Sequence, residues 1–118
     1  MKMYTNSEQT AKLIELGFEK PKSVTEISWS EYEKDSPIIN ANSIEYTRHY
    51  SIGELIEMLP KSIKVNECFF ALTIGAGSKN WLIEYNDIVF GSQGVVLEAE
   101  LIDALFTEIV ILKEEGVI

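Results

Sequence analysis

The sequence predicts an α+β fold in which a small antiparallel sheet of three to four strands packs against a long C-terminal helix and two shorter helices. Three patterns support this fold. The segment Glu98 to Gly116 has apolar residues at helical spacing. Two apolar stretches, 63–74 and 81–85, flank the turn sequence GAGSKN. Two shorter segments, 6–16 and 52–59, combine helical periodicity with residues that cap helices.

The predicted C-terminal helix is apolar over roughly half of its circumference, which is wider than the stripe of an ordinary surface helix. Such a helix must lie against a broad surface, and one face of a sheet is the simplest. Gly116 is expected to end the helix in the left-handed conformation. The apolar side consists of Leu101, Ile102, Leu105, Phe106, Ile109, Val110 and Leu112.

The opposite side of this helix is acidic and is the candidate partner surface. It consists of Glu100, Asp103, Glu108, Glu114 and Glu115, with Ile111 near its centre. An apolar centre inside a charged rim is a common arrangement in protein–protein interfaces. The alternative is a solvated helix face on which Ile111 is a single exposed apolar residue of the ordinary kind.

The first third of the chain contains one predicted helix and a long connection. Residues 6–16 begin at a capping residue and end at a glycine. Residues 19–43 are rich in turn-forming and charged residues, so we expect a long surface connection with one short strand at 24–29. Two aromatic residues of this segment, Trp29 and Tyr32, are either core residues or partner contacts.

A strand and the second short helix are predicted between residues 44 and 60. Ile44 to Tyr50 alternates between apolar or aromatic and polar residues, as a half-buried strand does. Ser51 is followed three residues later by Glu54, the signature of a capping box at a helix start. Pro60 ends the helix.

The rest of the sheet is predicted as a hairpin with one further strand. Residues 63–74 form one mostly buried strand and residues 81–85 the returning strand. Ile88 to Phe90 is expected to begin a third strand. The sequence GSQG then turns the chain, and Val95 to Leu97 leads into the last helix.

The charge of the chain argues against two classes of partner. Its 118 residues carry a formal net charge of −9. Residues 84–118 hold eight acids and one base, whereas residues 1–35 hold seven acids and five bases. This imbalance argues against direct nucleic-acid binding and against anionic membranes, and it favours a basic protein partner or simply solubility. A nucleic-acid site would need a patch formed by Arg48, Lys61, Lys64 and Lys79.

The cysteine content and the start of the chain indicate a compartment. Cys68 is the only cysteine, which excludes an intramolecular disulfide and a cysteine metal cluster. The N-terminal residues lack the apolar region of a signal peptide, and no apolar run approaches the ~20 residues of a membrane span. We therefore expect a soluble cytoplasmic protein with a single domain over residues 1–118.

Groups that could carry chemistry are few. His49 is the only histidine, and a nucleophilic pair with Cys68 is the one enzymatic alternative, since both fall on strands of the expected sheet. Residues 75–79 connect two strands, whereas a phosphate-binding loop opens a helix. Neighbouring carboxylates such as Glu54 and Glu57 are typical of a solvated face. We expect no cofactor and no metal site.

Several segments together carry a resemblance. HYSIGELIEMLPKSI, WLIEYND and ELIDALFTEIVILKEEGVI occur in this order, after the opening SEQTAKLIELGFEKPKS. With these segments the chain resembles small acidic proteins encoded in phage and mobile-element clusters of gut bacteria, over most of its length. That family often carries an aromatic residue where this chain has Ile111. It has no established activity, so the resemblance implies a phage or mobile-element context and no chemistry.

The sequence thus predicts a small acidic cytoplasmic interaction or accessory protein of phage or mobile-element origin, without catalysis, which binds a protein partner or itself. The alternative is an enzyme or enzyme subunit with a site around His49 or Cys68. On the first hypothesis, Ile111→Lys would leave folding nearly intact and abolish partner binding.

Overall fold

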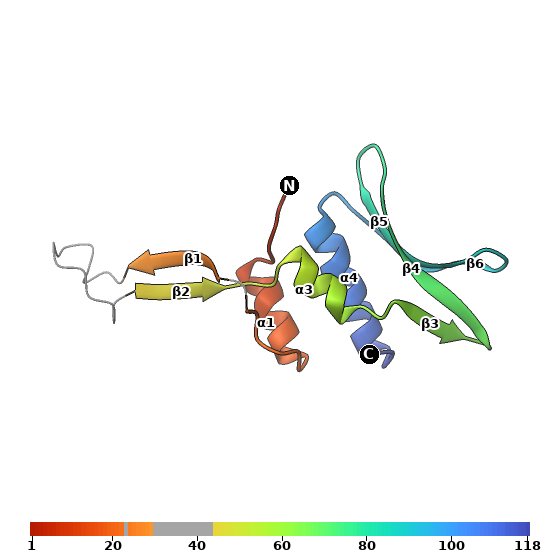
Figure 1. Cartoon of the computed structure of the whole chain (residues 1–118), viewed down its shortest axis with the longest axis horizontal. Helices are drawn as coiled ribbons and strands as arrows, with labels where there is room; N and C mark the ends of the chain where they lie inside the picture. Colours follow the sequence, from red (N-terminus) through yellow and green to blue (C-terminus); the bar gives the residue numbers. More distant parts are fainter. Residues whose placement is uncertain (23, 30–43) are drawn as a thin grey trace.

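Three described helices lie between two separate antiparallel sheets (Figure 1). The computed structural model describes residues 1–22, 24–29 and 44–118, and for 24–29 and 44–47 the backbone only. The helices are α1 (Ser7–Glu15), α3 (Ile52–Met58) and α4 (Leu101–Glu114). The strands are β1 (Val24–Trp29), β2 (Ile44–Arg48), β3 (Ser62–Val65), β4 (Cys68–Ala76), β5 (Trp81–Asp87) and β6 (Gly91–Glu98). The predicted α+β fold is confirmed.

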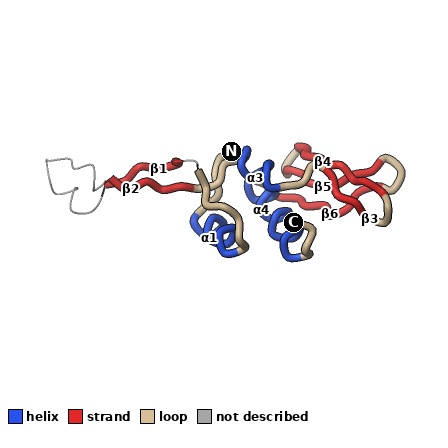
Figure 2. The backbone as a smooth tube through the Cα atoms, turned by 60° about the horizontal axis from the view of Figure 1, so that its bottom comes forward, coloured by secondary structure: helices blue, strands red, loops and turns tan. Residues whose placement is uncertain are grey.

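The strand predicted near residue 44 does not join the main sheet. β2 pairs with β1 in a two-stranded sheet, and β3-β4-β5-β6 form a separate four-stranded antiparallel sheet in sequence order. Figures 1 and 2 place the β1–β2 hairpin and the four-stranded sheet on opposite sides of the helices. The short strand predicted within 19–43 is therefore confirmed as β1, whereas Tyr32 and the Trp29 side chain lie outside the described part of the chain.

The single strand predicted over residues 63–74 is in fact a hairpin of β3 and β4. Its turn consists of Asn66 and Glu67, which have φ angles of 49° and 68°. Positive φ at both central residues is the requirement of the tight turn that best matches strand twist. Asn adopts this conformation readily, but Glu does not, so the turn was not evident from the apolar run around it.

The segment after β5 also differs from the prediction. Residues 88–90 form a turn in which the Asp87 Oδ1 atom accepts hydrogen bonds from the backbone N–H groups of Val89 and Phe90, at 2.8 and 3.0 Å. The predicted turn GSQG is the first half of β6. β6 pairs with β5 except where Gly94 and Val95 bulge opposite Glu84. Gly94 has φ +58°, which suits a glycine in a β-bulge.

Helix α4 has 14 residues and is shorter than predicted. It begins at Leu101 because Glu98 belongs to β6, and it ends at Glu114 before Gly116, whose φ of +78° confirms the predicted left-handed end. α4 packs against β5 and β6 on one side and against α3 on another. The buried core consists of Leu13, Tyr50, Leu55, Leu59, Phe70, Ile83, Tyr85, Val96, Leu101, Ile102, Ala104, Leu105, Ile109 and Leu112.

Both short helices begin at the predicted caps. In α1 the Asn6 side chain accepts from the Gln9 backbone N–H at 2.8 Å, and the Gln9 side chain accepts from the Asn6 N–H at 3.0 Å. In α3 Ser51 and Glu54 make the same reciprocal pair, as the sequence predicted. Each such cap contributes about 1 kcal/mol to helix stability.

The β3–β4 turn leads to a first prediction. Glu67→Gly should raise the free energy of unfolding by about 0.5–1 kcal/mol, because glycine adopts φ of +68° without the steric cost that Glu67 bears. The Glu67–Lys64 ion pair, 3.3 Å, is exposed and its loss should matter little. Chemical denaturation measures the change. Glu67→Ala is the control and should give no gain, and equal effects of the two changes would contradict strain at this turn.

Candidate functional site

The predicted acidic surface of α4 is not one surface, and the inclusion of Glu108 was wrong. Glu108 is 0% exposed. On a helix it lies about 140° from Asp103 but only about 40° from Leu112, so it belongs to the apolar side. The signal was present in the sequence. The residues three and four positions away, on both sides, are Ala104, Leu105, Ile111 and Leu112, and all are apolar.

Glu108 points from α4 toward the bulge of β6. A Cβ atom at Gly94 would lie 3.2 Å from the Glu108 Oε1 atom, so the carboxyl group is packed directly against this glycine. Neither carboxyl oxygen has a hydrogen-bond partner among the described residues. A buried polar group without a partner is costly and is rare in folded proteins.

Burial also changes how the groups around Glu108 titrate. Burial, and secondarily the charge of Glu115, raise the pKa of Glu108 to about 7. Burial and the charge of Glu108 together raise the pKa of Tyr85 to about 12. The Tyr85 hydroxyl donates to the Pro60 carbonyl oxygen at 2.8 Å, which anchors β5 to the end of α3. Burial therefore moves the titration of the Glu108 carboxyl group toward neutral pH.

Two other residues of the predicted surface contact the N-terminal segment. The Lys2 ammonium group and the Gln9 side-chain amide donate to the Asp103 Oδ1 atom at 2.9 and 2.7 Å. Burial acts to raise the pKa of Asp103, but these hydrogen bonds and the Lys2 charge together lower it. Glu100 accepts from the backbone N–H of Lys2 at 3.0 Å. These contacts join the start of the chain to the start of α4.

The remaining residues of the predicted surface lie at the end of α4. Glu114 and Glu115 are exposed, and Glu114 is 3.8 Å from the Lys12 ammonium group. Ile111 is half-buried and packs against the core rather than projecting from an acidic face. Ile111→Lys would therefore disturb packing, which removes this position as a clean test of partner binding.

The structure does not bring His49 and Cys68 into one sheet as predicted. His49 follows β2, and its Nδ1 atom is hydrogen-bonded to the Thr10 hydroxyl at 2.7 Å. Cys68 begins β4 in the other sheet, on the far side of the helices (Figure 1). A nucleophile and its base must be within hydrogen-bonding reach, so this arrangement does not assemble the predicted pair.

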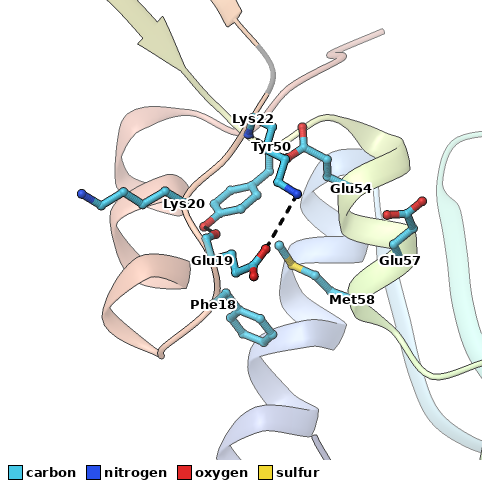
Figure 3. A pocket seen from close by; sticks show the side chains of 8 residues that line it. All are labelled: Phe18, Glu19, Lys20, Lys22, Tyr50, Glu54, Glu57 and Met58. Atoms are coloured by element: carbon cyan, nitrogen blue, oxygen red, sulfur yellow. Dashed lines mark hydrogen bonds and ion pairs between the residues drawn. The ribbon is translucent and has the colours of Figure 1, made fainter.

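A cavity of about 230 Å³ lies between α3 and the segment that follows α1 (Figure 3). Tyr50 lies within it, and its hydroxyl donates to the Glu19 carbonyl oxygen. Burial and the charge of Glu54 raise the pKa of Tyr50. Lys22 reaches toward Glu19, 3.9 Å away, whereas Lys20 points outward. The charged residues that line this cavity are of both signs, so the cavity does not favour a ligand of either charge.

The most unusual exposed feature is the edge strand β6 of the four-stranded sheet, together with the turn that precedes it. Residues 88–97 contain no ionisable side chain, although Asp87 and Glu98 flank them. We call these ten residues the sheet-end surface. Five of its apolar side chains are more than half exposed: Ile88 (101%), Val89 (79%), Phe90 (63%), Val95 (53%) and Leu97 (59%). The sequence shows this neutral stretch, but only the strand pairing shows that it forms an exposed edge.

The described residues contain no group of three or more His, Cys, Asp or Glu residues that could hold a metal ion. Within the same residues no helix has the length and apolar character needed to cross a bilayer. Comparison with protein-family models, curated proteins and solved structures found no match, so function must be argued from the chain itself.

The burial of Glu108 leads to a second prediction. Its pKa of about 7 in the folded chain exceeds the ordinary value of 4.5, so the folded state binds a proton more tightly than the unfolded state. The resulting stabilisation is complete below pH 4.5 and is lost as the pH rises to about 7, by about 3 kcal/mol in total. Glu108→Gln should flatten this fall and leave the variant more stable than the native chain at pH 8.

Chemical denaturation between pH 5 and 8 measures this effect. Glu115→Gln is the matched control, because it removes a charge near Glu108 at an exposed position and should keep most of the slope. An unchanged slope in Glu108→Gln would show that Glu108 is not the titrating group.

The contact between Glu108 and β6 leads to a third prediction. Gly94→Ala should lower the free energy of unfolding by more than about 1 kcal/mol, because a Cβ would meet the carboxyl group at 3.2 Å and φ is +58°. Gly75→Ala is the control on the same sheet, since a Cβ there meets no atom within 4 Å. In a Glu108→Ala background, part of the Gly94→Ala cost should disappear. Full additivity in this double-mutant cycle would contradict the contact.

Proposed function

We propose that this chain is a small interaction or accessory protein, without catalysis, that binds a protein through the sheet-end surface. One observation supports the proposal: ten consecutive neutral residues, with five apolar side chains more than half exposed, form a turn and an edge strand. Single exposed apolar residues are ordinary, but several of them on one uncharged segment are typical of interaction sites.

The chemistry of this surface indicates how a partner would be bound. Burial of apolar surface stabilises a complex by about 25 cal/mol per Å² before the costs of association. An edge strand adds unpaired backbone N–H and C=O groups, which can pair with an extended segment. Recognition of this kind needs no opposite charge, so the proposal replaces the basic partner and the acidic helix surface that the sequence suggested.

The cellular context is part of the proposal. The single cysteine agrees with a reducing compartment, which supports a cytoplasmic location. The resemblance to small acidic proteins of phage and mobile-element clusters supports that origin. The acidic residues elsewhere on the chain would keep the free protein soluble.

Photocrosslinking in the cells that naturally express the chain tests this function. Phe90, 63% exposed in the turn before β6, is replaced by p-benzoylphenylalanine. Irradiation should give one discrete covalent adduct. Adding Val95→Lys and Leu97→Lys should reduce its yield at least about tenfold, because two ammonium groups would have to be desolvated at the interface.

Two controls make the outcome specific. The same photoreactive residue at Glu15, exposed at the end of α1, should give no such adduct. Thr73→Lys, exposed on β4, should leave the Phe90 adduct unchanged. Absence of an adduct at Phe90, or equal yields at positions 15 and 90, would refute the proposal.

A further inference from the structure

We infer that the occupant of the sheet-end surface is a second copy of this chain, held by antiparallel pairing of β6 with β6 of the copy. This inference rests on the proposed function, which assigns the surface but leaves the partner open. It would join two four-stranded sheets into one sheet of eight strands across a two-fold axis.

The first argument is the difference between the two edges of the sheet. β3, at one edge, has four residues, includes the exposed Lys64 and follows the exposed Lys61. Short length and lysine are the usual protection of an edge against pairing. β6, at the other edge, has eight residues and no basic residue. Among the described edge strands of this sheet, β6 is therefore the longer one and the one without lysine.

The second argument is electrostatic. Two copies of a chain with net charge −9 repel each other over most approaches. The sheet-end surface is the place where they can meet without ionised groups, because residues 88–97 are neutral. Antiparallel pairing of the two β6 strands also places the two Glu98 residues at opposite ends of the paired strands. Like charges directly opposite each other in a sheet are thereby avoided.

The third argument is symmetry. β5 has a neighbour on each side, and β4 has β3 beside it over Cys68–Ala71. Pairing β6 with β3 of another copy is a heterologous contact, which adds further copies until a ring closes or a filament forms. Pairing β6 with β6 is self-complementary and closes at two copies. It also leaves the short, lysine-bearing β3 as the outer edge on both sides.

The bulge in β6 fits this arrangement. Gly94 and Val95 interrupt the pairing with β5, and regular pairing continues at 91–93 and at 96–98. Leu97 is cross-strand partner to Leu82, so an added strand would extend an apolar row on that face. Val95 and Leu97, 53% and 59% exposed, would lose contact with water.

Sedimentation equilibrium of the purified chain from about 1 µM to about 1 mM tests the inference. The mass should rise from one chain to two and no further. The dissociation constant of the dimer should fall as salt is raised from about 0.05 to about 0.5 M, because salt screens the repulsion between the two acidic copies. Val95→Lys combined with Leu97→Lys should raise the dissociation constant at least about a hundredfold, whereas the control Thr73→Lys should not change it.

Each outcome decides the inference. A single-chain mass at every concentration, or a dimer that persists in the double lysine variant, would overturn it. If the lysine variant is not folded by circular dichroism, Val95→Thr with Leu97→Thr keeps strand propensity and should still raise the dissociation constant about tenfold. If the chain is monomeric but the Phe90 crosslink captures a different protein, the inference of a second copy is wrong and the proposed function stands. If neither forms, the proposed function fails as well.

Discussion

The packing of α4 against the inner face of the four-stranded sheet holds the rest of the structure together. Ile102, Leu105 and Ile109 of the helix are fully buried, as are Ile83 and Tyr85 of β5. α3 packs on another side of the same helix, and the Tyr85 hydroxyl reaches the carbonyl oxygen of Pro60. Because one helix serves both layers, loss of its apolar contacts would expose the sheet and the helices together.

Glu108 lies inside this interface and sets a limit on its stability. A carboxyl group without a hydrogen-bond partner in an apolar contact opposes folding when it is ionised. Its contact with Gly94 couples the shape of β6 to a residue of α4. The bulge that bends the open edge strand is therefore placed opposite a titratable group. Natural chains commonly break local rules of this kind at functional positions.

Several acidic side chains that the sequence suggested were free for a partner are paired within the folded chain. Asp103 and Glu100 contact Lys2, and Glu114 lies near Lys12, so part of the negative charge of α4 is used within the chain. The neutral residues 88–97 lie in β6 and in the turn before it. On the proposed function, charge limits where copies or partners approach, and apolar burial together with strand pairing supplies the attraction.

The features that the sequence predicted correctly depend on residues close to one another in the chain. The helix cap at Asn6, the capping box at Ser51, the β4–β5 hairpin and the amphipathic last helix are all of this kind. Helical period, strand alternation and turn chemistry act over a few residues. The assignment of Glu108 to the acidic side was wrong, although the residues three and four positions away are all apolar and indicate the buried side.

The other features of the fold were decided by tertiary structure alone, because these features depend on contacts between residues that are distant in the sequence. Strand pairing decides three features against local propensity. They are the division into two sheets, the extended GSQG segment in β6, and the turn at Asn66 and Glu67. The depth of Glu108 likewise depends on β6 covering it. The location of an open edge is a property of which strands find partners, and no local pattern contains that information.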